Sequence, residues 1–149
     1  LFKGKALLTH VLSEHVFEHL SREETRLALK LIYDHMKPGG RLRIAVPDGY
    51  NPDPVYIQHV GINGIGADAS DHKQLLNKDT LTDFLEEVGF AVEMLEGYLK
   101  NGDLVQKTIN ASDGRILRSR SNSENMAGKA GWGFADANTS LVIDGIKLK

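Results

Sequence analysis

The sequence predicts an α/β fold with a mostly parallel sheet, covering helices and an antiparallel strand at the carboxyl end. Residues 6–12 form an apolar run with only two polar interruptions, which is typical of a strand buried on both faces. An amphipathic helix follows from Ser21, and the alternation in residues 42–46 predicts a second strand. Two strands joined by a helix form a right-handed crossover, the unit of a parallel sheet.

The boundaries of this first helix have clear signals. Ser21 with Glu24 three residues later forms a capping box, which predicts the start. Pro38 cannot continue a helix, and Gly39-Gly40 supply the left-handed residues that a helix exit needs. The helical spacing predicts a buried stripe of Ala28, Leu31, Ile32 and His35.

The rest of the chain continues the domain. The pattern predicts a short helix at 55–60 with Asp53 as its cap, an amphipathic helix at 79–88 that Gly89 ends, and strands at 90–95, 104–109 and 140–148. Asn101-Gly102 indicates a hairpin between the strands at 90–95 and 104–109. Residues 115–133 are basic and weakly patterned, so we expect a long loop. Without a linker or repeat, residues 1–149 form a single domain.

The composition excludes several classes of function and of binding site. The 149 residues are 41% hydrophobic and 26% charged, as in an ordinary folded domain. A net charge of −2 argues against nucleic-acid binding, which usually needs a basic excess. The absence of cysteine excludes disulfides and thiolate metal sites. No apolar run approaches the about 20 residues of a membrane span. We therefore expect a cytoplasmic protein with no membrane partner.

Several segments, taken in order, resemble one family. They are Ser13-Glu-His-Val-Phe-Glu-His-Leu20, Lys37-Pro-Gly-Gly40, the strand to Asp48, Asp48-Gly-Tyr-Asn-Pro-Asp-Pro54, Gly66-Ala-Asp-Ala-Ser-Asp-His-Lys73, the helix into Glu87-Val-Gly-Phe90, and Thr139-Ser-Leu-Val-Ile-Asp144. This set resembles class I S-adenosylmethionine-dependent methyltransferases, in particular a predicted group of undefined substrate. The resemblance implies a Rossmann-like fold, S-adenosylmethionine as cofactor and methyl transfer to an unknown acceptor.

The family's main cofactor-binding motif is missing from this pattern. In the family, that motif consists of a glycine-rich turn after the first strand and an acidic residue that ends the second strand. The glycines at 61, 64 and 66, and those at 128, 131 and 133, lack the preceding strand that gives such a turn its meaning. Of the family's strand order 3-2-1-4-5-7-6, the resemblance therefore implies that only 4-5-7-6 is present. Because the chain begins with Leu1, we expect a truncated or processed product or an incomplete gene fragment.

The expected binding residues follow the ends of the two parallel strands, where ligands bind in open α/β sheets. Ser13, Glu14 and His15 follow the first strand and are candidates for cofactor binding; alternatively, Glu14 and His15 cap the helix and bond each other. Asp48 and Tyr50 follow the second strand and are candidates for substrate binding. Tyr50 could cover a ligand, although a half-buried loop tyrosine is the commoner situation.

Two further groups of residues are candidates for a general base and for a metal site. Asp71 could orient His72 as a general base, although a solvated loop or an Asp71 helix cap is the interpretation we prefer. His15-x-x-Glu18-His19 matches a zinc-peptidase pattern. That chemistry needs one helix and a third ligand, and we found neither, so we expect no metal and structural roles for Glu18 and His19.

Other features have two interpretations. Arg115, Arg118 and Arg120 could form an anion patch or, as we prefer, a solvated turn, and Trp132 could fill the core or a partner surface. The strand at 6–12 has an apolar open edge, so we expect a homodimer through that edge or through exchanged segments. The function we expect is a methyltransferase-like enzyme fragment, inactive alone; the alternative is a non-catalytic remnant or interaction module.

Overall fold

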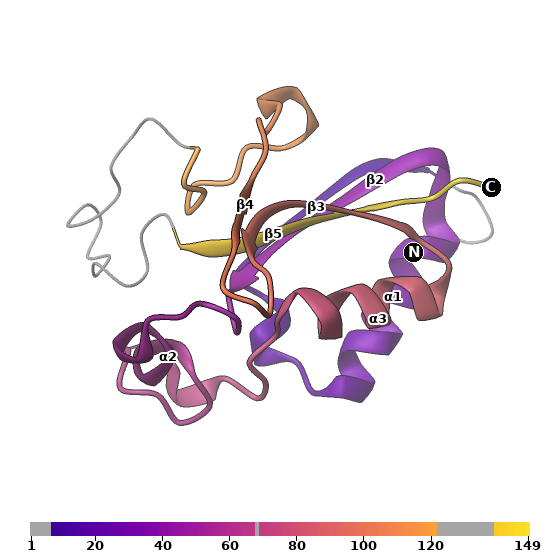
Figure 1. The fold of residues 1–149 in the computed structure, drawn as a ribbon. Helices are drawn as coiled ribbons and strands as arrows, with labels where there is room; N and C mark the ends of the chain where they lie inside the picture. The colour runs from indigo at the N-terminus through magenta and orange to yellow at the C-terminus, as the bar shows by residue number, and fades with distance from the viewer. Residues whose placement is uncertain (1–6, 68, 122–138) are drawn as a thin grey trace.

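The computed structural model describes residues 7–67, 69–121 and 139–149, which form a five-stranded sheet with helices against one face (Figure 1). In chain order the elements are β1 (Leu8–Glu14), η1 (Phe17–His19), α1 (Arg22–His35), β2 (Met36–Pro47), α2 (Pro54–Val60), η2 (Ala69–Asp71), α3 (Lys78–Val88), β3 (Ala91–Tyr98), β4 (Leu104–Gln106), η3 (Ala111–Asp113) and β5 (Ser140–Ile146). The η elements are single 3₁₀ turns. None of the helices in this described part of the chain has both the length and the apolar character that crossing a bilayer requires.

The sheet has the strand order β1-β2-β5-β3-β4, and it is mainly antiparallel. Only β1 and β2 pair in parallel; the three other pairings among the described strands are antiparallel. The expectation of a mostly parallel sheet was therefore wrong. The reason is β5, which enters between β2 and β3 and runs opposite to both, so that no second parallel pair can form.

The order of the strands agrees with the expected remainder of the methyltransferase sheet. β1, β2, β5 and β3 occupy the places of strands 4, 5, 7 and 6. β4 adds a fifth strand outside β3 through a hairpin around Asn101-Gly102, where Gly102 has a φ of +89°. The turn signal therefore predicted both the hairpin and its antiparallel return.

Helix α1 starts as predicted but ends earlier. Ser21 Oγ accepts from the backbone N–H of Glu24, and the Glu24 carboxylate accepts from the N–H of Ser21. The helix ends at His35, and β2 runs from Met36 through the residues expected to form the helix exit. A register shift opposite this stretch of β2 accommodates Pro38, which a regular ladder would exclude.

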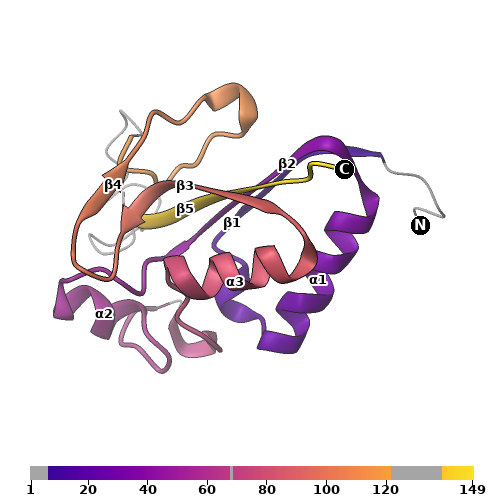
Figure 2. The same cartoon turned by 45° about the vertical axis from the view of Figure 1, so that its right-hand side comes forward.

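The buried face of α1 also differs from the predicted stripe. Thr25 and Leu29 are fully buried, whereas Leu31 is 51% exposed. The sequence from Leu27 to Ile32 is almost continuously apolar, so the helical spacing alone could not define which side packs on the sheet. Figure 2 shows α1 and α3 side by side against the same face of the sheet.

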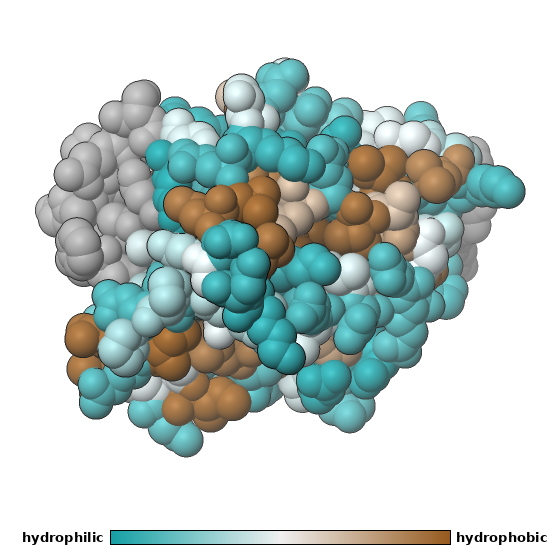
Figure 3. Space-filling view, viewed as in Figure 1, coloured by the Kyte–Doolittle hydropathy of each residue, from teal (hydrophilic) through white to brown (hydrophobic). Residues whose placement is uncertain are grey.

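The sheet has a core on each face. The larger core lies between the sheet and the helices and includes Leu29, Ile44, Leu81, Phe84 and Ile143. The smaller core lies on the opposite face, where Ile116 from the segment after β4 covers Ala45, Leu95 and Val142. In the view of Figure 3 apolar side chains form separate patches, one of them over the α2 region, where Val55 is 67% exposed.

Candidate functional site

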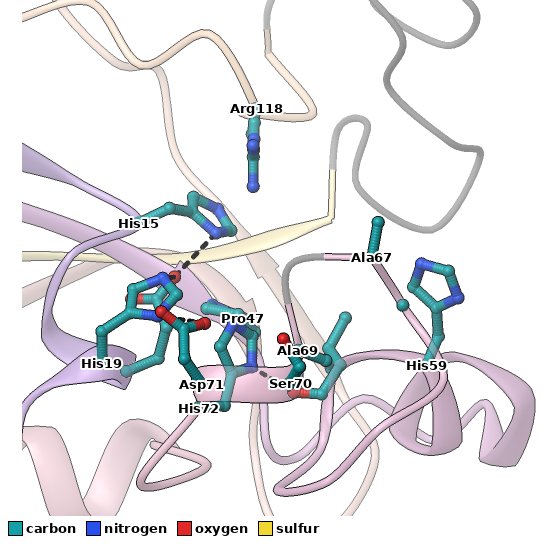
Figure 4. A pocket seen from close by; sticks show the side chains of 13 residues that line it. His15, His19, Pro47, His59, Ala67, Ala69, Ser70, Asp71, His72 and Arg118 are labelled. Atoms are coloured by element: carbon teal, nitrogen blue, oxygen red, sulfur yellow. Dashed lines mark hydrogen bonds and ion pairs between the residues drawn. The ribbon is translucent and has the colours of Figure 1, made fainter.

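A cavity of about 380 Å³ lies at the edge of the sheet where the two parallel strands end (Figure 4). β1 ends at Glu14 and β2 at Pro47, and Pro47 lines the cavity. This is the edge at which open α/β sheets bind ligands, and the volume lies within the range of small-molecule sites. The polar lining consists mainly of imidazoles and carboxylates: His15, Glu18, His19, His59, Asp71 and His72.

His15 turns the chain out of β1 into the cavity wall. Its φ of +53° is uncommon for a residue with a side chain, and its N–H still bonds the carbonyl of Ala45 on β2 at 2.8 Å. Its Nε2 lies 2.8 Å from Ser140 Oγ at the start of β5, and its Nδ1 lies 3.0 Å from Glu18 Oε1. Its position is therefore fixed by β1, which it follows, and by contacts with β2 and β5. Of the three residues expected to bind cofactor, His15 is the one that lines the cavity.

Glu18 and His19 lie on η1, which is fastened to the segment that follows η2. The carbonyl of Glu18 accepts from the N–H groups of Lys73 at 2.8 Å and Gln74 at 3.3 Å. The buried amide of Gln74 donates to the carbonyls of Phe17 and Leu20 and to Thr25 Oγ1 of α1. Two segments more than 50 residues apart in the chain are thereby held side by side at the floor of the cavity.

Asp71 and His72 both line the cavity, but they do not pair with each other as the general-base hypothesis required. The Nδ1 of His72 lies 2.7 Å from the carbonyl of Val60, and the imidazole is 8% exposed. Asp71 Oδ1 instead lies 3.0 Å from Nδ1 of His19. The less favoured interpretation, an Asp71–His72 pair, does not form because consecutive residues of a 3₁₀ turn and its exit point their side chains in different directions.

Ser13 and Glu14 are strand residues here, since β1 extends two residues beyond the predicted end. Ser13 pairs with Ile44 in the parallel register. The carboxylate of Glu14 accepts from the N–H groups of Leu117 at 3.1 Å and Arg118 at 2.7 Å. Glu14 therefore positions the segment that carries Arg118, whose side chain points toward the cavity from the opposite side in Figure 4.

Asp48 is fully buried beside the cavity edge, and its carboxylate joins the ends of β2 and β3. It accepts from the N–H of Tyr50 at 3.0 Å and of Tyr98 at 2.7 Å. Tyr50 points its hydroxyl at Asp79 Oδ2 on α3, at 2.7 Å. Neither Asp48 nor Tyr50 lines the cavity, so the positions expected to bind substrate serve here to hold neighbouring elements.

Burial shifts two ionisable groups near this edge. It raises the pKa of Asp48 above 3.8, although the two backbone N–H donors lower it in part. It also raises the pKa of Tyr56 to about 12, because the phenol is enclosed between Asp48 and Thr139. Tyr56 accepts from the N–H of Asp48 at 3.0 Å, so these two groups form one buried contact.

The three arginines do not form one patch. Arg118 lines the cavity, whereas Arg120 donates to Glu96 at 3.2 Å and to the carbonyl of Ser140 at 2.9 Å. Arg115 is exposed. Trp132 and the glycines at 128, 131 and 133 lie outside the described residues. The segment 115–121 forms no helix or strand, as expected for that part of the predicted loop.

Sequence reasoning missed His59 and Arg118 as residues of the cavity. The glycine-rich loop after α2 brings His59 there: the N–H of Gly66 bonds the carbonyl of His59, and a Cβ at Gly66 would lie 2.8 Å from His59 Nε2. Position 66 therefore requires glycine, because a side chain there would collide with the imidazole of His59. As expected, a helix rather than a strand precedes this loop, so it does not form a cofactor turn.

Comparisons with known proteins support the fold. No family model matches the sequence, and no curated protein is similar enough to be matched. The solved structure of a SAM-dependent methyltransferase from Archaeoglobus fulgidus aligns over 97% of this chain with a TM-score of 0.55 and 22% sequence identity. The chain spans 61% of the length of that structure. The fold of the described residues is thus methyltransferase-like.

Proposed function

We propose that this chain is the carboxyl-terminal part of an S-adenosylmethionine-dependent methyltransferase and that the cavity is where the reacting end of the cofactor meets the methyl acceptor. The observation that carries the proposal is the position of the cavity. It lies at the carboxyl ends of β1 and β2 in a fold shared with a SAM-dependent methyltransferase. The absence of cysteine is compatible with the cytoplasmic location that we propose with it.

The residues present fit part of the cofactor. His15 and Arg118 both line the cavity, and the Arg118 guanidinium suits the carboxylate at the methionine end. When bound, the cofactor supplies the activated methyl group. The chain's own residues would then orient the acceptor and exclude water, because methyl transfer depends mainly on alignment. We propose that the glycine-rich turn and the ribose-binding acid belong to a part of the protein outside these 149 residues.

Calorimetric titration of S-adenosylhomocysteine into the 149-residue chain tests the proposal. We expect saturable micromolar binding that is lost in Ser70→Trp, which places an indole at the exposed mouth of the cavity. Ser112→Trp is the matched control, because Ser112 occupies the same place in the identical Ala-Ser-Asp turn of η3, away from the cavity. Binding that both tryptophan variants retain would contradict the proposal that the cavity holds the cofactor, and no binding at all would mean that the cavity is not sufficient without the glycine-rich turn and the ribose-binding acid.

We also propose that two copies of the chain pair along β1. Among the described strands β1 pairs with β2 alone, and Leu12 on it is 48% exposed. A strand edge of this kind pairs readily with another strand, and two identical edges can meet about a two-fold axis. The solution mass of the chain tests this proposal.

A further inference from the structure

We propose that Glu18, His19 and His72 bind a zinc ion at the floor of the cavity. One ligand atom from each of these residues lies within 4.8 Å of the other two. In the sequence, zinc was suggested only by the pattern His15-x-x-Glu18-His19. That pattern uses the two imidazoles as ligands, and the sequence indicated no third ligand for them. The fold brings His72 close to Glu18 and His19. His15 stays beside Glu18, with Nδ1 3.0 Å from Oε1, but its Nε2 lies 2.8 Å from Ser140 Oγ, so the proposed ligand set is a different one. This proposal is independent of methyl transfer.

The carboxylate of Glu18 is the strongest sign of a missing cation. Glu18 is 1% exposed, and neither of its oxygens makes a hydrogen bond. Oε1 lies 3.0 Å from Nδ1 of His15 and 3.9 Å from Nε2 of His19, but neither contact has the geometry of a hydrogen bond. A buried carboxylate without partners is strongly unfavourable, and binding to a metal ion is one of the two usual solutions. The other solution is pairing with protonated imidazoles.

The ring of His72 is arranged as that of a metal ligand usually is. A ligating imidazole typically donates its second nitrogen to a carbonyl or a carboxylate, which fixes the tautomer and the orientation of the ring. The carbonyl of Val60 lies 2.7 Å from Nδ1 of His72, so with Nδ1 protonated Nε2 keeps its lone pair for a metal ion. In His19 the carboxylate of Asp71 lies 3.0 Å from Nδ1, but this contact lacks the geometry of a hydrogen bond.

The ligands are held together before any ion binds. Glu18 and His19 share one 3₁₀ turn, and the N–H of Lys73, next to His72, bonds the carbonyl of Glu18. Zinc–nitrogen and zinc–oxygen bonds of about 2.0–2.2 Å place the donors of a tetrahedral site roughly 3.3–3.5 Å apart. The present separations, within 4.8 Å, therefore need to shorten by at most about 1.5 Å when the ion binds.

The chemistry of the donors favours zinc over harder cations. Imidazole nitrogens suit zinc and other transition metals, whereas magnesium and calcium prefer oxygen ligands. Two histidines and one glutamate form a known set of protein ligands to zinc, and this set leaves a fourth position for water or substrate. All three residues line the cavity, so that position opens toward the ligand space.

Calorimetry on the untagged, chelator-treated chain tests the site, with zinc chloride as the titrant. We expect one ion to bind per chain with a micromolar or tighter dissociation constant, and magnesium chloride to give no saturable heat. Glu18→Gln, which keeps the size of the side chain, and His72→Gln should each weaken zinc binding at least about tenfold. His10→Gln is the matched control, because His10 is an exposed histidine on β1 outside the cluster.

Two further measurements separate a metal site from a purely structural role. Cobalt chloride should produce visible absorption from low-symmetry coordination in the wild type and in His10→Gln, but not in the cluster variants. Zinc should shift the imidazole nitrogen resonances of His19 and His72 in the wild type, which requires no variant to fold. Absence of saturable zinc binding would overturn the proposal. Binding that the cluster variants keep and His10→Gln loses would also overturn it.

Discussion

Replacing one partner of the buried pair formed by Arg43 and Asp144 should cost a large share of the protein's stability. The two residues face each other in the register of β2 and β5 and are 2% and 0% exposed. Arg43 Nε and Nη2 donate to the two carboxylate oxygens at 2.8 Å each. Removing one member of such a pair typically costs about 3–5 kcal/mol, because the other charge remains buried without its partner.

The surroundings decide which variant costs more. Within the described part of the chain, Asp144→Leu leaves Arg43 hydrogen-bonded to the carbonyls of Asn110 and Gly114 alone, so we expect a loss of about 4–5 kcal/mol in the free energy of unfolding. Arg43→Met leaves Asp144 with a second cation, the partly exposed Arg41, so we expect about 3 kcal/mol. The double variant should lose about 2–3 kcal/mol less than the sum, because two apolar side chains leave no buried charge of the pair.

Urea unfolding followed by circular dichroism measures these differences. With a slope of about 2 kcal/mol per molar urea, a loss of 4 kcal/mol lowers the midpoint by about 2 M. Lys30→Met is the control, because its pair with Asp34 lies on the surface and should contribute less than about 1 kcal/mol. Single losses below about 1 kcal/mol at Arg43 and Asp144, or losses that simply add, would refute the reasoning.

Three other features give predictions. Followed by NMR, the carboxyl carbon of Asp48 should titrate with a midpoint above pH 3.8, because burial raises its pKa. The stability of the wild type relative to Asp48→Asn should be greatest below pH 3.8 and should fall as the pH rises through the raised pKa. A titration midpoint below pH 3.8 would contradict this prediction. Tyr56→Phe leaves the buried N–H of Asp48 without an acceptor and should cost about 1–3 kcal/mol in urea unfolding, against little change for Tyr50→Phe. Light scattering should give a dimer mass for the wild type and a monomer mass for Leu12→Lys on the β1 edge; a monomeric wild type would refute the dimer.

The fold was predictable where a local signal and the global topology agreed. The Ser21 capping box, the Asn101-Gly102 hairpin and the Gly89 helix end each depend on a few adjacent residues, and the structure confirms them. The exit of α1 and its buried face were wrong because tertiary packing decides them. Pro38 and Gly39 belong to strand β2, and the N–H of Gly39 donates to the carbonyl of Lys147, which follows β5.

The candidate site was predictable only in outline. The rule that ligands bind beyond the carboxyl ends of strands indicated the edge of the sheet where the cavity lies, and His15, which lines it. It could not show that Asp71 faces His19 or that His72 lies against Glu18. Those contacts depend on Gln74, whose amide joins two distant segments, and no local pattern in the sequence reveals such a long-range bond.

The position of β5 has a consequence for how the chain is made. β5 is the last of the described strands to leave the ribosome, yet it lies between β2 and β3. Until residues 140–146 emerge, the parallel β1–β2 pair and the β3–β4 hairpin have no strand to connect them. Asp144, which completes the buried pair with Arg43, arrives in the same step. The nascent chain should therefore remain in two half-sheets with exposed apolar faces, and the sheet should close only as synthesis passes its central strand.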